Sequence, residues 1–257
     1  MDTAPLRLRR LVRDTSRALL DLVLPPLCLN CRALVADPHA VCGPCWSALR
    51  FLGPPHCAQC GVPFPYDLGQ GMKCPACLAR PPAFDCARSA LAYDDASRDL
   101  ILGFKHADRL ETVPLFGRLM RNVARDPLEG ASFLVPVPLH WRRLVARRYN
   151  QAAELAHALS KLTGVPVDAT GLIRTKRTRS QGEMVSARER KKNVAGAFAV
   201  TPAARARFEG RKIVLVDDVL TTGATLTACT KTLLRNGAAS VSLITLARVV
   251  RPLNLTL

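Results

Sequence analysis

The chain has 257 residues, 49% of them hydrophobic, which is enough for one large domain or two smaller ones around a buried core. Its formal net charge is +17, from 37 basic and 20 acidic residues, and predicts attraction to polyanions such as nucleic acid or to phosphorylated small molecules. Pro25 and Pro26 interrupt the only early apolar run, so the sequence argues against a transmembrane segment and against a signal peptide. We therefore expect a cytoplasmic protein.

Residues 1–27 are predicted to form a basic, amphipathic N-terminal arm. Their apolar residues recur at roughly helical spacing, and arginines occupy positions between them. Such an arm can pack on its own protein, bind a partner or lie on a membrane surface. Packing is the explanation that we favour.

Eight of the ten cysteines form four Cys-x-x-Cys pairs, a pattern typical of zinc-binding turns. The pairs are Cys28/Cys31, Cys42/Cys45, Cys57/Cys60 and Cys74/Cys77. Each pair can supply two thiolates to one tetrahedral ion from a tight turn. Ten residues separate the first two pairs and thirteen separate the last two, which predicts two zinc sites made by sequential pairs. An interleaved arrangement, with the first pair joining the third, stays open.

Both zinc ions are expected to be structural, because four thiolates leave no open position for water. The zinc module would span residues 28–82 and end at Pro81-Pro82. It is rich in proline and glycine, so metal would supply much of its folding free energy. Disulfides are the weaker alternative, since the chain shows no export signal.

From residue 86 to residue 257, short apolar runs alternate with helical patterns. We predict strands at 87–93, 133–138, 165–173, 213–216 and 239–247, and helices at 97–104, 113–124, 149–162 and 224–235. This alternation predicts an α/β domain with a mostly parallel sheet and helices on both faces. Ligands of such sheets bind at the carboxyl ends of the strands.

The most informative stretch is residues 212–225, KIVLVDDVLTTGAT. A short apolar strand ends on Asp217 and Asp218, whose carboxylates can accept hydrogen bonds from vicinal ribose hydroxyls. The turn that follows opens a helix, and its N–H groups, hydroxyls and helix dipole suit a phosphate. Gly223 lets the backbone approach that phosphate closely. Either feature alone would fit a solvated loop or a helix cap, but in this order they predict a sugar-phosphate site.

The positive charge is concentrated in residues 140–192, which hold thirteen Lys or Arg and four Asp or Glu. A phosphate-bearing small molecule, DNA and a solvated charged face each fit this stretch, and the three explanations stay open. Trp141 and Tyr149 are its only aromatic residues besides histidine, so a stacking platform for single strands is not indicated.

Two further regions carry a resemblance to a known family. The first is residues 135–151, VPVPLHWRRLVARRYNQ. The second consists of residues 172–181, LIRTKRTRSQ, and residues 188–198, RERKKNVAGAF. With the cysteine pairs and VDDVLTTGAT, they resemble the ComF family over residues 28–249. That family joins an N-terminal zinc module to a type I phosphoribosyltransferase-like domain, and its members are associated with natural competence, the uptake of DNA for transformation. One departure is Arg148, where the family often has glycine.

The resemblance implies 5-phosphoribosyl 1-pyrophosphate (PRPP) as ligand, bound with Mg²⁺. Asp217 and Asp218 would hold the ribose and be the catalytic pair. The remaining roles follow the family's motifs. The 5′-phosphate would bind Thr221, Thr222, Gly223, Ala224 and Thr225; Arg147 and Arg148, with Lys105 as a weaker candidate, would face the pyrophosphate; and Arg174, Lys176, Arg177 and Gln181 would belong to a flexible hood that closes the site.

We therefore predict a PRPP-binding, phosphoribosyltransferase-like protein that acts in DNA uptake and transfers a phosphoribosyl group to an unidentified acceptor. The alternative is a non-catalytic zinc protein that responds to PRPP or binds single-stranded DNA. The resemblance also implies single-stranded DNA and the DNA-uptake machinery as partners. Contact with that machinery would place the protein at the periphery of the inner membrane.

Overall fold

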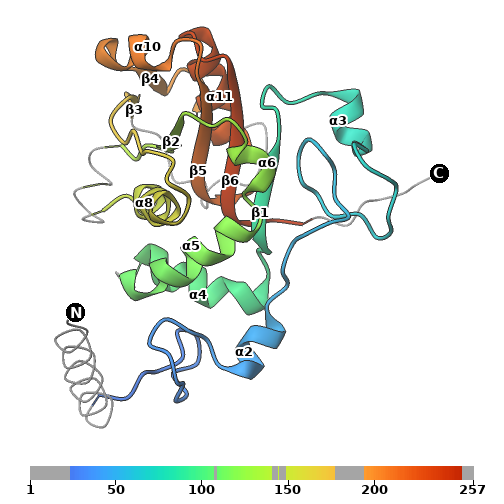
Figure 1. The fold of residues 1–257 in the computed structure, drawn as a ribbon, viewed down its shortest axis with the longest axis vertical. Helices are drawn as coiled ribbons and strands as arrows, with labels where there is room; N and C mark the ends of the chain where they lie inside the picture. Colours follow the sequence, from blue (N-terminus) through green and yellow to red (C-terminus); the bar gives the residue numbers. More distant parts are fainter. Residues whose placement is uncertain (1–23, 107–108, 141–143, 145–148, 177–193, 251–257) are drawn as a thin grey trace, which may run out of the picture. The chain divides into compact units, whose positions relative to one another are not determined.

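The computed structural model describes residues 24–106, 109–140, 144, 149–176 and 194–250 (Figure 1). The chain divides into two compact units, residues 1–48 and 49–257. In the first unit, the described residues form the short helix α2 (Gly43–Ala48) and a β-bridge between Leu27 and Leu34. Most of the predicted N-terminal arm lies outside the described residues. The predicted bounds of the arm, the zinc module and the C-terminal domain, at 1–27, 28–82 and 86–257, stay a prediction.

A four-stranded parallel sheet forms the core of the second unit. Its order is β1 (Ala87–Ala92), β6 (Ser240–Arg248), β5 (Lys212–Leu220) and β2 (Phe133–Pro136), so β5 and β6 lie in the centre (Figure 1). The apolar runs of both central strands are buried on both faces, as expected for a parallel sheet covered by helices. In the register, Leu220 at the end of β5 pairs with Arg248 at the end of β6.

Helices pack on both faces of the sheet. On one face, α5 (Val113–Asn122) and α8 (Gln151–Thr163) contact each other; α5 also contacts β1 and β6, and α8 contacts β2 and β5. On the other face, α11 (Ala224–Arg235) buries Leu226, Cys229 and Leu233 in one cluster with alternate residues of β5 and β6. The predicted α/β architecture, with a mostly parallel sheet and helices on both faces, is confirmed.

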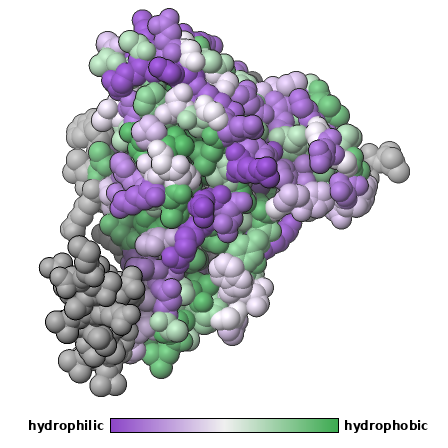
Figure 2. Space-filling model, viewed as in Figure 1, coloured by the Kyte–Doolittle hydropathy of each residue, from purple (hydrophilic) through white to green (hydrophobic). Residues whose placement is uncertain are grey.

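The remaining elements complete the second unit. They are α3 (Pro75–Ala79), α4 (Asp95–His106), the 3-10 turn η1 (Leu110–Thr112), α6 (Arg125–Leu128), α10 (Pro202–Phe208), and a two-stranded antiparallel sheet of β3 (Leu172–Arg174) and β4 (Phe198–Val200). The surface over α10, at the top of Figure 2, is mostly hydrophilic. Among the described residues, no helix is both long and apolar enough to cross a bilayer.

The strand predicted at 165–173 is wrong over most of its length. Val167 makes a single parallel bridge to Leu134, and the chain then turns. The turn forms because the Asp168 carboxylate accepts hydrogen bonds from the N–H groups of Thr170 and Gly171, at 3.2 and 2.7 Å. The chain leaves the main sheet there, and only 172–174 form a strand, in the small antiparallel sheet.

The central strand β5 is longer than the predicted 213–216. It continues through Leu220, paired with β6 at Asp217, Val219 and Leu220. The two acids therefore lie within the strand and are not the start of a loop. Because a hydrogen-bonded strand holds them, their backbone is fixed before any ligand arrives.

Candidate functional site

The two acids project from the carboxyl-terminal part of β5. Each carboxylate accepts a hydrogen bond from the next backbone N–H: Asp218 N–H donates to Asp217 Oδ1 at 2.9 Å, and Val219 N–H donates to Asp218 Oδ1 at 2.5 Å. Both side chains are half-buried. Burial, and then the neighbouring Asp218 carboxylate, raises the pKa of Asp217 to about 8. At neutral pH the two carboxyl groups together therefore carry a negative charge of less than two.

A tight turn connects β5 to α11 and encloses a small hollow. Gly223 has φ 73°, a left-handed conformation that side chains with a Cβ rarely adopt, and its carbonyl accepts the Thr227 N–H at 2.8 Å. The hollow, of about 20 Å³, is lined by residues 217, 219–221 and 223–226. The Asp217 carboxylate, the threonines of the turn and the start of a twelve-residue helix therefore converge on one concave spot, which suits an anion carried on a polyol.

Two of the turn's hydroxyls have different surroundings. Thr221 is exposed, whereas Thr222 is half-buried and its Oγ1 is enclosed without a hydrogen-bond partner among the described residues. A buried hydroxyl without a partner is costly, so a ligand oxygen at this point would be stabilising.

Lys105 forms the clearest ion pair of the site. Its Nζ lies 3.1 Å from Asp218 Oδ2, and the two side chains are only 20% and 17% exposed. Lys105 stands near the end of α4, far from the acids in sequence. The structure thus brings together these two predicted site residues.

Residues 149–151, at the start of α8, hold Lys105 in place. The Tyr149 hydroxyl donates to the Phe104 carbonyl at 2.6 Å, and Gln151 Nε2 donates to the Lys105 carbonyl at 3.2 Å. Between them, Asn150 caps α8 by accepting the Ala152 N–H and donates to the Val137 carbonyl. Sequence reasoning treated this tripeptide only as part of a motif and missed its positioning role; its place between a strand-loop and a helix start was the available signal.

Arg174, at the end of β3, is the second cation near the acids. Its charge, like that of Lys105, acts to lower the pKa of Asp217, against the stronger effects of burial and Asp218. Its guanidinium also lies over the Phe198 ring, 5.4 Å from the centroid. Lys176 is exposed, and its Nζ lies beside Gly196. The remaining predicted cation and hood residues, Arg147, Arg148, Arg177 and Gln181, lie outside the described residues.

The eight paired cysteines form two groups, as predicted from sequential pairs. Within each group, the four sulfur atoms lie within 4.8 Å of one another. The groups are Cys28, Cys31, Cys42 and Cys45, and Cys57, Cys60, Cys74 and Cys77. The interleaved alternative is therefore wrong.

The geometry of both groups fits zinc. The Cys31–Cys42 and Cys60–Cys74 sulfur atoms are 3.5 and 3.7 Å apart, close to the edge of about 3.8 Å in a tetrahedron with Zn–S bonds of about 2.3 Å. These separations are far longer than a disulfide bond, and none of the ten cysteines takes part in a disulfide. Backbone N–H groups point at the sulfurs: Cys42 N–H donates to Cys28 Sγ, and Cys74 N–H donates to Cys57 Sγ, both at 3.2 Å. These sites hold structural zinc, with no position left open for a substrate.

The second cysteine group is built onto the edge of the sheet. The Ala87 N–H at the start of β1 donates to the Gln59 carbonyl at 2.7 Å, and Arg88 Nη1 donates to the Ala58 carbonyl at 3.0 Å. From the neighbouring strand, Arg248 Nη1 donates to the Cys60 carbonyl at 2.5 Å. Gly61 approaches so closely that a Cβ would lie 2.3 Å from the Ala87 carbonyl oxygen.

Comparisons with known proteins also divide the chain into a zinc-binding part and a part with the parallel sheet. The double zinc ribbon domain matches residues 19–78, and the phosphoribosyl transferase domain matches residues 150–252. The chain is 33% identical over 235 residues to DNA utilization protein YhgH of Escherichia coli K12, covering 89% of this chain and all of that one. It is 30% identical over 227 residues to competence protein F of Haemophilus influenzae, covering 86% and 96%. Competence protein ComFC of Bacillus subtilis is 30% identical over 163 residues, which is 63% of each chain.

Proposed function

Because the chain belongs to the ComF family, the family of competence protein F, we propose that it binds PRPP at the end of β5 and acts in the handling of DNA during its uptake. The observation that carries the PRPP site is the hollow in which Asp217 of β5, Thr221 and Gly223 of the turn and the start of α11 meet, with Asp218 next to Asp217 in the strand. The DNA-handling role is supported by the names of the relatives and by the net charge of +17.

In this proposal, the acids hold the ribose. Carboxylates are strong acceptors for its two vicinal hydroxyls, and β5 fixes their position. The 5′-phosphate would occupy the turn, where the left-handed Gly223 brings backbone N–H groups near and the enclosed Thr222 hydroxyl lacks a partner. Lys105 and Arg174 bring positive charge close to the two acids, which suits the pyrophosphate.

Mg²⁺ belongs to the proposal because its preferred ligands, carboxylate and phosphate oxygens, would meet at the two acids. When bound, it would offset charge on the pyrophosphate. Transfer would break the bond from ribose C1 to the pyrophosphate oxygen, whose electrons leave with the pyrophosphate, and form a bond from C1 to a nucleophilic nitrogen or oxygen of the acceptor, which would lose its proton to solvent. The cations Lys105 and Arg174 favour this step by stabilising the leaving group. A cytoplasmic place at the inner membrane, where imported DNA would arrive, is part of the same proposal.

The test is a calorimetric titration of PRPP with Mg²⁺ into the wild type and into the double variant Asp217→Asn/Asp218→Asn. Two hydrogen bonds to charged groups are worth about 3–6 kcal/mol together, so we expect the affinity to fall by at least about a hundredfold. The matched control is Asp94→Asn/Asp95→Asn, which removes an adjacent acid pair at the other end of α4. It should leave PRPP binding unchanged.

Unchanged affinity in a folded Asp217/Asp218 variant would refute the site. A folded, zinc-loaded wild type that binds no PRPP would favour the alternative, a non-catalytic zinc protein that binds single-stranded DNA. That alternative predicts a steep loss of DNA affinity with salt, since each phosphate contact releases counterions.

A further inference from the structure

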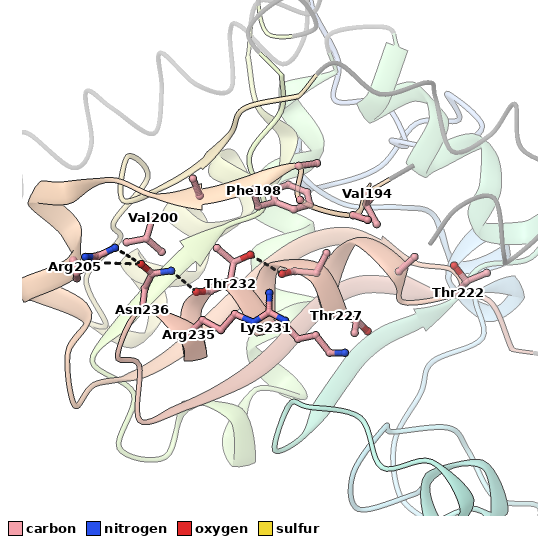
Figure 3. A pocket seen from close by; sticks show the side chains of 16 residues that line it. Val194, Phe198, Val200, Arg205, Thr222, Thr227, Lys231, Thr232, Arg235 and Asn236 are labelled. Atoms are coloured by element: carbon pink, nitrogen blue, oxygen red, sulfur yellow. Dashed lines mark hydrogen bonds between the residues drawn. The ribbon is translucent and has the colours of Figure 1, made fainter. Parts of the chain in front are cut away.

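A second concavity, much larger than the turn's hollow, runs between β4 and α11. Its volume is about 760 Å³, within the usual range of small-molecule sites (Figure 3). One wall is the segment 194–200, and the other is the outer face of α11. We call it the β4–α11 groove. It shares Ala224 with the hollow and also contains Thr222, so it borders the turn 221–225, but its other lining residues lie outside the proposed PRPP site.

The groove is a slot because both walls carry small side chains. Ala195, Ala197 and Ala199 line one wall, and Ala224 and Ala228 line the other. Phe198, which is almost fully buried, is the largest apolar side chain that lines it. A flat, largely apolar group could enter between such walls with little rearrangement.

The rim of the slot is positively charged. Lys231 and Arg235 are exposed and stand four residues apart on α11, so they are neighbours on the helix surface. In Figure 3 they follow one edge of the helix together with Thr227, whereas Thr232 and Asn236 lie toward Val200. Arg205 contributes a third cation from α10; its Nη2 donates to Asn236 Oδ1 at 3.0 Å, a neutral partner.

Within the part of the chain that the structure describes, no carboxylate is paired with these charges. The lining residues include neither Asp nor Glu, and within the described part of the chain none of the three cations takes part in an ion pair. Residues 177–192, which precede the groove wall in the sequence, have six basic and two acidic residues. This segment is itself positively charged and does not complement the charge of the three cations. A groove of this kind has an anionic ligand from outside as its natural occupant.

We propose that the β4–α11 groove binds nucleotide phosphates along Lys231 and Arg235, with the base in the alanine-lined slot. Neighbouring phosphates match a row of cations on one helix edge, and the slot matches the flat base. Phe198, the groove's only aromatic residue, is already covered by Arg174, so little discrimination among bases is expected. The inference rests on the DNA-handling half of the proposed function, and its phosphate contacts, Lys231 and Arg235, are not part of the proposed PRPP site.

A free nucleotide and a nucleic-acid strand share this chemistry, so both serve as probes. We would measure fluorescence anisotropy of a labelled oligodeoxythymidylate on the full-length, zinc-loaded protein, with unlabelled ADP and poly-glutamate as competitors. The test variant is Lys231→Glu/Arg235→Glu. The control is Arg121→Glu/Lys161→Glu, which makes the same charge change at exposed positions of α5 and α8.

We expect the test variant to bind the strand at least tenfold more weakly, and the control to change its affinity no more than about twofold. Loss of two phosphate contacts should also reduce the salt slope of strand binding by about 1.4, at about 0.7 per contact. PRPP affinity should stay the same in both variants, so failure of this inference is distinguishable from failure of the PRPP site. Competition by ADP at comparable concentration would identify a free nucleotide as the ligand, and its absence would identify a strand.

Equal losses in the test and control variants would overturn the inference, because they would show a general effect of net charge. Unchanged strand affinity in the test variant would overturn it as well. Displacement of the strand by poly-glutamate as readily as by unlabelled strand would replace nucleotides with an acidic protein segment as occupant.

Discussion

At the scale of single residues, Asp217 and Asp218 are neighbours with unequal surroundings. Asp218 has a lysine 3.1 Å away, whereas the pKa of Asp217 is raised by burial and by Asp218 itself. Sequence spacing predicted the pair and the turn after it, because both lie within fourteen consecutive residues. It could rank Lys105 only as a weak candidate, since nothing local indicates that the end of α4 lies beside β5.

The raised pKa of Asp217 predicts a pH dependence of PRPP binding. With a pKa of about 8, Asp217 holds a proton at neutral pH, and a ligand with Mg²⁺ that needs the carboxylate must displace it. We expect affinity to rise up to about tenfold per pH unit from pH 6 toward 8 and to level off above 8. Calorimetry in two buffers of different ionisation enthalpy should show proton release.

The single variant Asp217→Asn is the control for this prediction, because it has no proton to release. Its remaining PRPP affinity should be flat between pH 6 and 8. A wild-type affinity that is equally flat would contradict the assignment of the raised pKa to the binding site.

At the scale of elements, continuous apolar runs and helical periods were predictable, whereas elements that depend on particular side-chain contacts were not. The strands of the main sheet were found from their apolar runs, and α4, α5, α8 and α11 from their helical periodicity. The strand expected at 165–173 failed because Asp168 bonds the backbone ahead of it and Arg207 Nη2 donates to the same carboxylate at 2.6 Å. The short β4 and α10 depend on tertiary packing that no local pattern records, including the contact of Phe208 with Gly171.

Arg248 links two elements that the sequence treats separately. It ends β6 opposite Leu220, the last residue before the turn 221–223, and donates to the Cys60 carbonyl of the second cysteine group. We expect Arg248→Met to weaken zinc binding at that group by about 10–100-fold, as loss of outer partners of metal ligands does. Competition with a chromophoric chelator would measure this change.

The first cysteine group is the internal reference for that experiment, since its zinc affinity should not change. Arg211→Met, an exposed arginine of the same unit, is the matched variant. Equal zinc affinities of both groups in Arg248→Met and in the wild type would show that the contact to Cys60 is incidental.

At the scale of the whole molecule, two metal groups serve two units. The described hydrogen bonds of the first group join residues 26–46, and those of the second reach into β1 and β6. We expect about two zinc ions per chain by metal analysis of reduced protein. Cys28→Ser/Cys31→Ser and Cys57→Ser/Cys60→Ser should each remove one.

Only the second of these variants should lower the melting temperature of the sheet-containing unit, because it removes a support of the sheet edge. Zinc near zero in reduced wild-type protein would refute both sites. Similar melting of the two variants would mean that the second group supports the sheet no more than the first does.

Gly61 has a practical consequence for anyone who divides this chain. Its lack of a side chain lets the second cysteine group lie directly on β1, so the group and the strand have been fitted to each other. A fragment that begins after Pro82, where the composition suggests a boundary, would lack the second cysteine group and leave β1 without the residues that pack on it. Hybrids between relatives are better joined near Leu49, where the two units meet along the chain, so that only the first ribbon is exchanged.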